Sequence, residues 1–237
     1  MAGIATVLAG CSIELGLGSE PLEGSGQVET QVFDLDPFHN VEIGSQFTAF
    51  VTFEPNGIEL VEVTADDNFF EALQVEVKEQ TLVIRSEPGV SFEDFAELQV
   101  RIRTKTLETV QVSGASLVEV DANNGPDFEY LRVSGASEVS VIDAATSSID
   151  VRVSGASSVS VLGNAELVDL DVSGASEVDL RELEVERASV SLSGASTASI
   201  AQVEEVSGRV GGASELTLPD GVGDDVEVSG GSTLTNR

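Results

Sequence analysis

Side chains that could carry covalent or metal chemistry are scarce in this chain of 237 residues. It has one Cys, Cys11, and one His, His39, and it has no Trp. A catalytic triad needs a base beside a nucleophile, and a zinc site usually needs several His or Cys ligands. Neither residue can supply such a set alone. The sequence therefore predicts a protein that is not an enzyme and holds no cofactor.

Carboxylates are the one reactive group present in number. The chain has 42 acidic and 11 basic side chains, which give a formal net charge of -31. Glu177 and Asp179 stand two residues apart, about 6.5 to 7 Å between their backbones if they lie on a strand, and glycosidases use carboxylates at such separations. So many acids make pairs of this kind unavoidable. A β-helix enzyme acting on polysaccharide is therefore the alternative to a non-enzymatic function.

Two short acidic segments are weak candidates for a metal site. They contain Asp66 and Asp67, followed by Asn68, and Asp224 and Asp225, preceded by a glycine. Carboxylate and amide oxygens are calcium ligands, but the same residue types are typical of turns. A calcium-binding surface protein is a further alternative. Nucleic acid is excluded as a partner, because a polyanion would be repelled by this charge.

The only cysteine follows an apolar stretch that ends in Leu8-Ala9-Gly10-Cys11. Small residues before a Cys resemble the lipobox of prokaryotic lipoprotein signals, whose Cys is acylated. No basic residue precedes Cys11, so either the true start lies upstream or residues 1–11 are a remnant; the alternative is an inert cysteine. Residues 12–27, rich in Gly, Ser and Glu, then predict a flexible tether. We expect a protein of the cell envelope, attached to the membrane through lipid on Cys11, or secreted.

An internal repeat dominates the second half of the sequence. The tetrapeptide Ser-Gly-Ala-Ser and two variants of it recur every 18 to 21 residues. The copies occupy residues 113–116, 134–137, 154–157, 173–176, 193–196, 211–214 and 229–232. Each copy is flanked by alternating Val or Leu and polar residues, which indicates strands with one buried face.

This pattern predicts an all-β fold, a parallel β-helix or solenoid with rungs of about 20 residues. An antiparallel meander is the rival, but it does not explain one tetrapeptide per two strands. The usual crossover rule favours right-handed winding, and a variable loop such as residues 121–126 is expected to close each coil. At the corner, alternation places Gly114 and Ser116 inward, with the serine bonding a neighbouring backbone.

Aromatic residues divide the chain. All ten Phe and the single Tyr lie between Phe33 and Tyr130, so the later rungs must enclose a thin aliphatic core. Residues 28–107 predict an aromatic-rich β region that forms the first rungs or a cap over the starting edge. Residues 108–237 predict the solenoid built on the Ser-Gly-Ala-Ser repeat. The open edge near residues 233–237 could serve self-association.

Polar side chains on the outward positions of the rungs should form ladders along the solenoid. A solvated face is the simpler reading, because strands must present something polar to water. The alternative is a contact surface for a protein or a neutral glycan. The candidate residues are Ser158, Ser160, Glu177, Asp179, Thr197 and Ser199.

Several segments, taken in order, resemble a known bacterial family. They are residues 32–35, 41–43, 46–52, 63–68 and 82–84, followed by residues 107–115 with the repeated Val-Ser-Gly-Ala-Ser. In this order the chain resembles the putative auto-transporter adhesin, head GIN domain family, over nearly all of residues 30–237. The resemblance implies a secreted or lipid-anchored surface protein, a right-handed β-helix and an adhesin-like role. It implies no set of functional residues.

Overall fold

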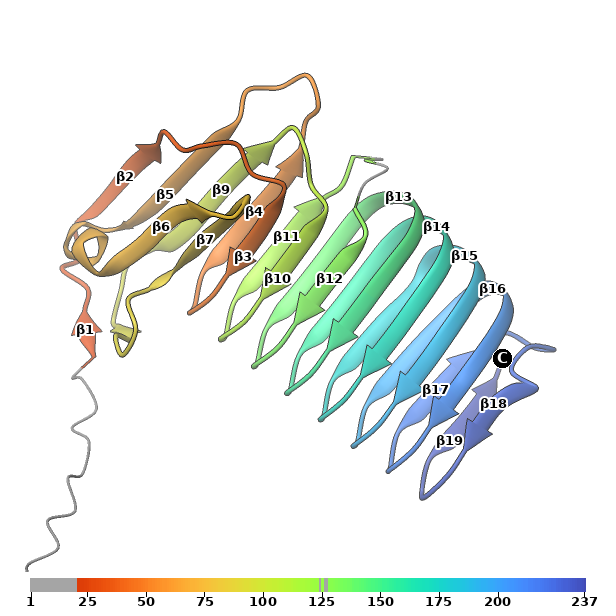
Figure 1. The fold of residues 1–237 in the computed structure, drawn as a ribbon. Helices are drawn as coiled ribbons and strands as arrows, with labels where there is room; N and C mark the ends of the chain where they lie inside the picture. The colour runs from red at the N-terminus through yellow and green to blue at the C-terminus, as the bar shows by residue number, and fades with distance from the viewer. Residues whose placement is uncertain (1–20, 124, 126–127) are drawn as a thin grey trace, which may run out of the picture.

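The computed structural model describes residues 21–123, 125 and 128–237, and this part of the chain is nearly all β (Figure 1). The N-terminal strands are β1 (Leu22–Glu23), β2 (Val28–Phe33), β3 (Asn40–Ile43), β4 (Thr48–Phe53), β5 (Leu60–Asp66), β6 (Leu73–Lys78), β7 (Thr81–Ser86), β8 (Phe92–Glu93) and β9 (Leu98–Thr104). A short 3₁₀ helix, η1 (Asp67–Ala72), separates β5 from β6. The later strands are β10 (Thr109–Val112), β11 (Leu117–Asp121), β12 (Tyr130–Val133), β13 (Glu138–Val153), β14 (Ser158–Val172), β15 (Glu177–Leu192), β16 (Thr197–Val210), β17 (Glu215–Leu218), β18 (Asp225–Val228) and β19 (Thr233–Asn236).

The strands stack into a solenoid with two long faces. The first face holds the strand that precedes each corner tetrapeptide, in the spatial order β6, β7, β3, β10, β12, β13, β14, β15, β16, β18. The second face holds the strand that follows the tetrapeptide, in the order β2, β5, β9, β4, β11, β13, β14, β15, β16, β17, β19. Pairing is parallel along both faces from β7 and β9 onward, which confirms the predicted parallel solenoid.

The first rungs do not follow the order of the chain. The rung made by β7 and β9 lies outside the rung made by β3 and β4, and the chain then passes from β9 to β10 on the far side of β3. Antiparallel strands close the starting end: β6 pairs with β7 on the first face, and on the second face β5 pairs with β9 and β2 pairs with β5. Residues 28–107 thus supply both rungs and a cap, and the stack begins well before residue 108.

The loop expected to close each coil is a strand in β13 to β16, so the prediction was wrong for these central rungs, whereas in the example of residues 121–126 the described residues 122, 123 and 125 lie outside any strand, as predicted. In β13 to β16 the chain stays extended between the two faces and forms a short third face, with Ser148, Leu167, Arg187 and Glu205 in register. The two-residue alternation is interrupted by irregularities at the bends, but the third face still buries a row of aliphatic side chains that are in register. These residues are Ile149, Val168, Ala188 and Val206.

One continuous core runs through the stack. Phe47, Phe69 and Phe92 are buried in the N-terminal region, where Phe69 and Phe92 stack with ring centroids 4.1 Å apart. Beyond Tyr130 the core consists of Val, Leu, Ile and Ala. The faces are close enough for aliphatic side chains alone to fill the space, as the absence of aromatics predicted.

The corner tetrapeptide stacks on itself from rung to rung. The N–H of Ala156 donates to the carbonyl of Gly135 at 2.8 Å, and the same bond recurs at each corner. Ser157 points inward and is 3% exposed; its hydroxyl donates to Ser154 O at 3.0 Å and accepts from Ser137 N at 3.4 Å. The predicted inward serine that bonds a neighbouring backbone is confirmed.

The glycine of the corner was wrongly placed by the alternation argument. Gly114 is exposed and has φ +83°, because a residue in the left-handed region interrupts the alternation of the strand. A Cβ on it would meet the Ser45 carbonyl of the adjacent rung at a separation that no real Cβ adopts. Glycine is needed here for its dihedral and for the close approach of rungs, and it does not fill the core.

Candidate functional site

An open hollow of about 340 Å³ lies on the outer side of the first face. Its lining includes Arg132 and Arg152, which are in register on neighbouring rungs, and Asp171, which follows them in the same row. The hollow exists because the corner positions beside this row are occupied by small residues, Ser134 and Ser154. Long polar side chains therefore stand beside a low floor, and we call this place the arginine hollow.

Charge in the arginine hollow is nearly balanced. Arg152 donates from Nε to Asp150 Oδ1 at 2.9 Å and from Nη2 to Asp150 Oδ2 at 2.8 Å. This hydrogen bonding, together with the charge of Asp150, raises the pKa of the Arg152 guanidinium, and Asp169 and Asp171 act in the same direction. The fork of hydrogen bonds orients Arg152 before any ligand arrives.

An exposed aromatic side chain adjoins the hollow. Tyr130 is 38% exposed, and the guanidinium carbon of Arg132 lies 5.7 Å from the centre of its ring. Tyr130 is in register with Asp150 of the next rung. Two adjacent rows of the first face thus combine an aromatic ring, guanidinium donors and carboxylate acceptors within a few rungs.

Sequence reasoning missed this group. The alternating pattern marks residues 132 and 152 only as polar positions between inward residues, and it marks Tyr130 only as the last aromatic residue of the chain. A signal was present, because the two arginines occupy the same place relative to successive tetrapeptides. In a chain with 11 basic residues, that coincidence could have indicated a shared surface.

The six predicted ladder residues lie on the second face in two straight rows. Ser158, Glu177 and Thr197 are in register, as are Ser160, Asp179 and Ser199. The five hollows described in the structure are lined by none of them. The structure brings the six together as expected, but on a flat surface.

The pair formed by Glu177 and Asp179 does not resemble a glycosidase centre. Arg181 donates from Nε to Asp179 Oδ1 at 2.9 Å, and this hydrogen bond lowers the pKa of the Asp179 carboxyl. A general acid needs the opposite shift. Asp179 therefore serves an ion pair at the surface, and nothing in its geometry favours the polysaccharide-acting alternative.

The acidic turn at Asp66 holds the N-terminal segment against the cap. Asp66 is fully buried, and its carboxylate accepts the N–H groups of Gly26 at 2.5 Å and Ala96 at 2.8 Å. Asp67 accepts the Ser25 hydroxyl. The carboxylate oxygens that could have met calcium are thus occupied by the protein itself.

Part of the predicted flexible tether is therefore ordered structure. Leu22 and Glu23 form β1, which pairs in parallel with β8. Asn68 strengthens this attachment by donating from Nδ2 to the Glu23 carbonyl at 2.8 Å. The tether prediction for residues 21–27 is corrected on these contacts, and the rest of residues 12–27 lies outside the described chain.

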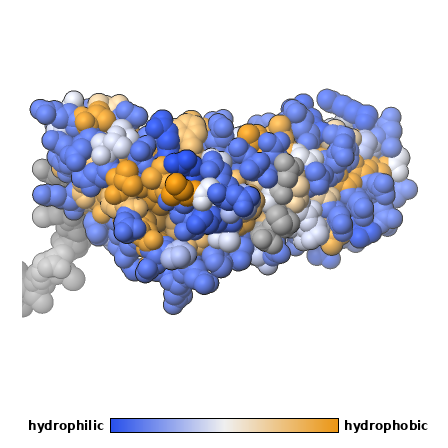
Figure 2. Space-filling model, turned by 90° about the horizontal axis from the view of Figure 1, so that it is seen from above, coloured by the Kyte–Doolittle hydropathy of each residue, from blue (hydrophilic) through white to orange (hydrophobic). Residues whose placement is uncertain are grey.

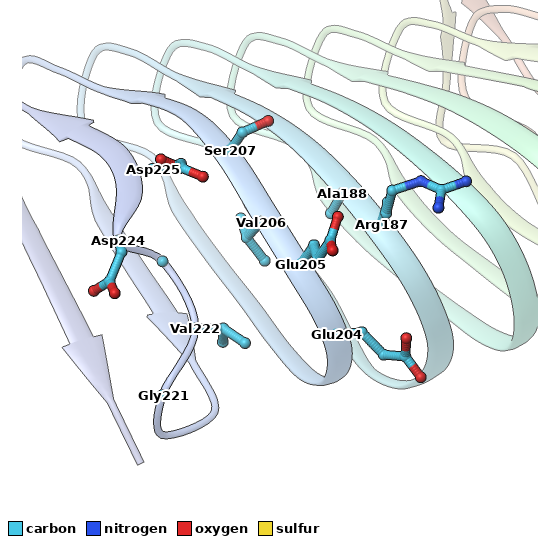
Figure 3. A pocket seen from close by; sticks show the side chains of 11 residues that line it. Arg187, Ala188, Glu204, Glu205, Val206, Ser207, Gly221, Val222, Asp224 and Asp225 are labelled. Carbon is cyan, nitrogen blue, oxygen red and sulfur yellow. The ribbon is translucent and has the colours of Figure 1, made fainter.

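The second acidic segment borders another open hollow, of about 420 Å³, near the C-terminal end. Asp224 and Asp225 share its lining with Glu204 and Glu205. Figure 3 shows these four carboxylates pointing in different directions. Across the described residues, no group of three or more His, Cys, Asp or Glu side chains could hold a metal ion. Calcium binding at either acidic segment stays a prediction.

The remaining expectations concern the two ends. Cys11 and its lipidation lie outside the described residues. No helix in the described part of the chain is long and apolar enough to cross a membrane. At the other end, β18 and β19 each pair along one edge only within the described chain, and Val228 is 44% exposed. Self-association through this edge stays a prediction, which sedimentation over a concentration series would test.

Comparison with known proteins gives a consistent result. A search of curated proteins finds no match. Among solved structures, a putative adhesin from Bacteroides fragilis has a TM-score of 0.82 at 17% identity and covers 91% of this chain and 100% of its own. A putative lipid binding protein from Parabacteroides distasonis (TM-score 0.71, 14% identity) and a putative adhesin from Parabacteroides merdae (0.66, 15%) each cover 92% of this chain and 100% of their own.

At these identities the solved structures establish the fold alone. The family model described as putative auto-transporter adhesin, head GIN domain, matches residues 37–219. This match begins just before β3 and ends just after β17, so it includes the interleaved first rungs as well as the repeats. The chain belongs to the putative auto-transporter adhesin, head GIN domain family.

Proposed function

We propose that this chain is a non-enzymatic, adhesin-like binding module of the cell envelope, and that its ligand lies along the first face at the arginine hollow. The observation that carries the proposal is the row of Arg132, Arg152 and Asp171 beside small serines, in which Asp150 holds Arg152 in place. Such a row offers donors and acceptors at the rung spacing of about 4.8 Å. Family membership and the fold of the neighbouring structures support an adhesin-like role.

A neutral glycan is the ligand class that fits this chemistry best. Guanidinium groups donate and carboxylates accept, so together they can bond sugar hydroxyls, while the Tyr130 ring offers apolar surface. Anionic glycans are disfavoured, because Asp150 forms an ion pair with Arg152, Asp171 adds a second negative charge near it, and the chain as a whole carries -31. The balance of charges at the hollow therefore favours hydroxyl-rich, uncharged ligands.

Binding can be tested on a neutral-glycan array with purified protein. We expect Arg152→Gln to weaken the strongest array signal about tenfold, since it removes charge-assisted hydrogen bonds of about 1.5 to 3 kcal/mol. Arg181→Gln is the matched control, because Arg181 forms the same ion pair with the Asp two residues before it, but on another surface. Equal effects of the two substitutions, or binding confined to anionic glycans, would contradict the proposal.

The flat rows of the second face are a second candidate, for a protein partner. Ser160 and Ser199 lie in the same register row, and the only residue between them in that row is Asp179. A flat polar surface suits protein contact better than a small ligand. Ser160→Arg should then abolish adhesion to cells while leaving glycan binding intact. Loss of both activities together would place the ligand on a single surface.

Attachment to the envelope through lipid on Cys11 is also part of the proposal. Small residues before the cysteine support it. Fractionation of cells that express the full chain and a Cys11→Ala variant would test it. We expect the full chain in the membrane fraction and the variant in the soluble fraction, and an identical distribution would refute anchoring at this residue.

A further inference from the structure

A further hollow, of about 260 Å³, lies at the N-terminal end of the solenoid. Part of its apolar lining is Phe33, the last residue of β2, and Leu35, which follows it. The rest is Ile58, which precedes β5, and Leu60, the first residue of β5. Phe38 and Val61, both 2% exposed, form the floor. We call this place the apolar hollow.

The apolar hollow includes a hydrophobic side chain that is unusually exposed for this solenoid. Ile58 is 77% exposed, the highest value among the large hydrophobic side chains of the described residues. Figure 2 shows apolar surface gathered over the N-terminal strands and surrounded by hydrophilic surface. In a chain with 42 acidic side chains, such a patch with a polar border is typical of an interaction site.

The size of the hollow limits what can enter it. Sites for small organic ligands measure about 300 to 1,000 Å³ and enclose most of the ligand. At about 260 Å³, the apolar hollow can receive one or two side chains and leaves the rest of a partner outside. Whatever binds here must therefore gain further affinity from the border.

The border is acidic. Asp34, Asp36 and Glu59 line the hollow, and none of the three forms an ion pair or side-chain hydrogen bond with another residue of the described chain. Lys105 is the one basic residue in the lining, so the local charge is three negative against one positive. A fatty acid or an anionic lipid would bring a negative head group against these carboxylates. Basic groups beside an apolar anchor are complementary to them.

We infer that the apolar hollow docks a partner protein segment in which one large aliphatic side chain is flanked by Lys or Arg. The aliphatic side chain enters between Leu35 and Ile58, and the basic side chains meet Asp34, Asp36 and Glu59. The charge of -31 would also speed the encounter with a basic partner. This surface shares no lining residue with the arginine hollow, so the inference does not rest on the proposed glycan site.

The inference can be tested with labelled peptides and purified protein. The probe is a fluorescein-labelled peptide, Gly-Lys-Lys-Leu-Lys-Lys-Gly, and its control has Ser in place of Leu; binding is followed by fluorescence anisotropy. We expect the Leu peptide to bind about five- to tenfold more tightly than the Ser peptide, from partial burial of one side chain. High salt should weaken both peptides.

Variants of the protein then locate the binding. Ile58→Ser should remove the preference for the Leu peptide, whereas Leu167→Ser, at a side chain that is 40% exposed on the third face, should change affinity less than about twofold. Asp36→Asn should weaken both peptides, and Glu138→Gln, at an exposed acid of the second face, should not. Within each pair, the variant and its control change the net charge by the same amount: the two serine variants leave it unchanged, and the two amide variants each remove one negative charge.

Four results would overturn the inference. The first is equal affinity for the Leu and Ser peptides, and the second is an unchanged preference in Ile58→Ser. The third is competition by an uncharged acyl detergent that displaces the Leu peptide at high salt and low salt alike, which would assign the hollow to lipid. Concentration-dependent dimerisation that Ile58→Ser abolishes would instead assign it to a second copy of the chain.

Discussion

Replacement of Gly155 by Ala should loosen the stacking of the corners. Gly155 has φ +86°, and a Cβ on it would lie 2.3 Å from the carbonyl oxygen and 3.0 Å from the nitrogen of Gly135 on the neighbouring rung. Ordinary contact begins at about 3.4 Å, so the rungs would have to separate locally by about 1 Å. The hydrogen bond from Ala156 N to Gly135 O, at 2.8 Å, opposes that movement.

The expected loss of stability has two parts. A left-handed residue with a Cβ costs about 1–2 kcal/mol, and overpacking costs about 1–3 kcal/mol, which together give about 2–5 kcal/mol. Gly221→Ala is the matched control, because Gly221 also has φ +86° but no atom lies within 4 Å of its added Cβ. The control should lose only the first part.

Urea unfolding followed by circular dichroism would compare the two variants. Repeat arrays can unfold in parts, so hydrogen exchange should also be measured, and we expect faster exchange at the corners beside residue 155. If Gly155→Ala and Gly221→Ala lose equal stability, close approach of the rungs is not what requires glycine at the corner.

Three further perturbations test other contacts of the described chain. Ser157→Ala should lower the free energy of unfolding by about 1 kcal/mol, since it removes a buried hydroxyl that bonds Ser154 O and Ser137 N. Ser158→Ala is the control, and it should leave the free energy of unfolding unchanged because Ser158 is exposed. Asp66→Asn should free residues 21–27, visible as faster hydrogen exchange there, because it disturbs the acceptor of the Gly26 and Ala96 N–H groups; calcium that raises the melting temperature of the unaltered protein would contradict this role. Arg181→Gln should raise the Asp179 pKa toward its ordinary 3.8, as followed by NMR titration. A lowered pKa stabilises the fold above the ordinary value and less as pH falls through the lowered one, so the difference in Tm between this variant and the unaltered protein should be present at neutral pH and vanish in strong acid.

The repeat made the fold predictable because its information is local. A tetrapeptide with Gly at its second position and Val at alternate flanking positions specifies two strands and a corner within each copy. The inward serine of the corner followed from the same alternation. The outward glycine did not, because the left-handed dihedral of that residue interrupts the period on which the argument depended.

The candidate sites depended on information that is not local. The notion that Asp66 and its neighbours bind calcium came from composition, whereas their partners at Gly26 and Ala96 lie 40 and 30 residues away. Arg132 and Arg152 were visible in the sequence, but their hollow needed the small corner side chains of several rungs. Such neighbours meet only when the register between rungs is known.

The sequence by itself determined that this chain is a parallel β-solenoid with a thin aliphatic core and few groups able to do chemistry. The tertiary structure alone decided that the β3 and β4 rung lies between the β7 and β9 rung and β10, that the N-terminal segment is held on Asp66, and that apolar side chains gather at the capped end. The physical reason is that strand order and register depend on pairing between residues far apart in the sequence. A two-residue alternation specifies which side chains face the core, but it does not specify which strands pair.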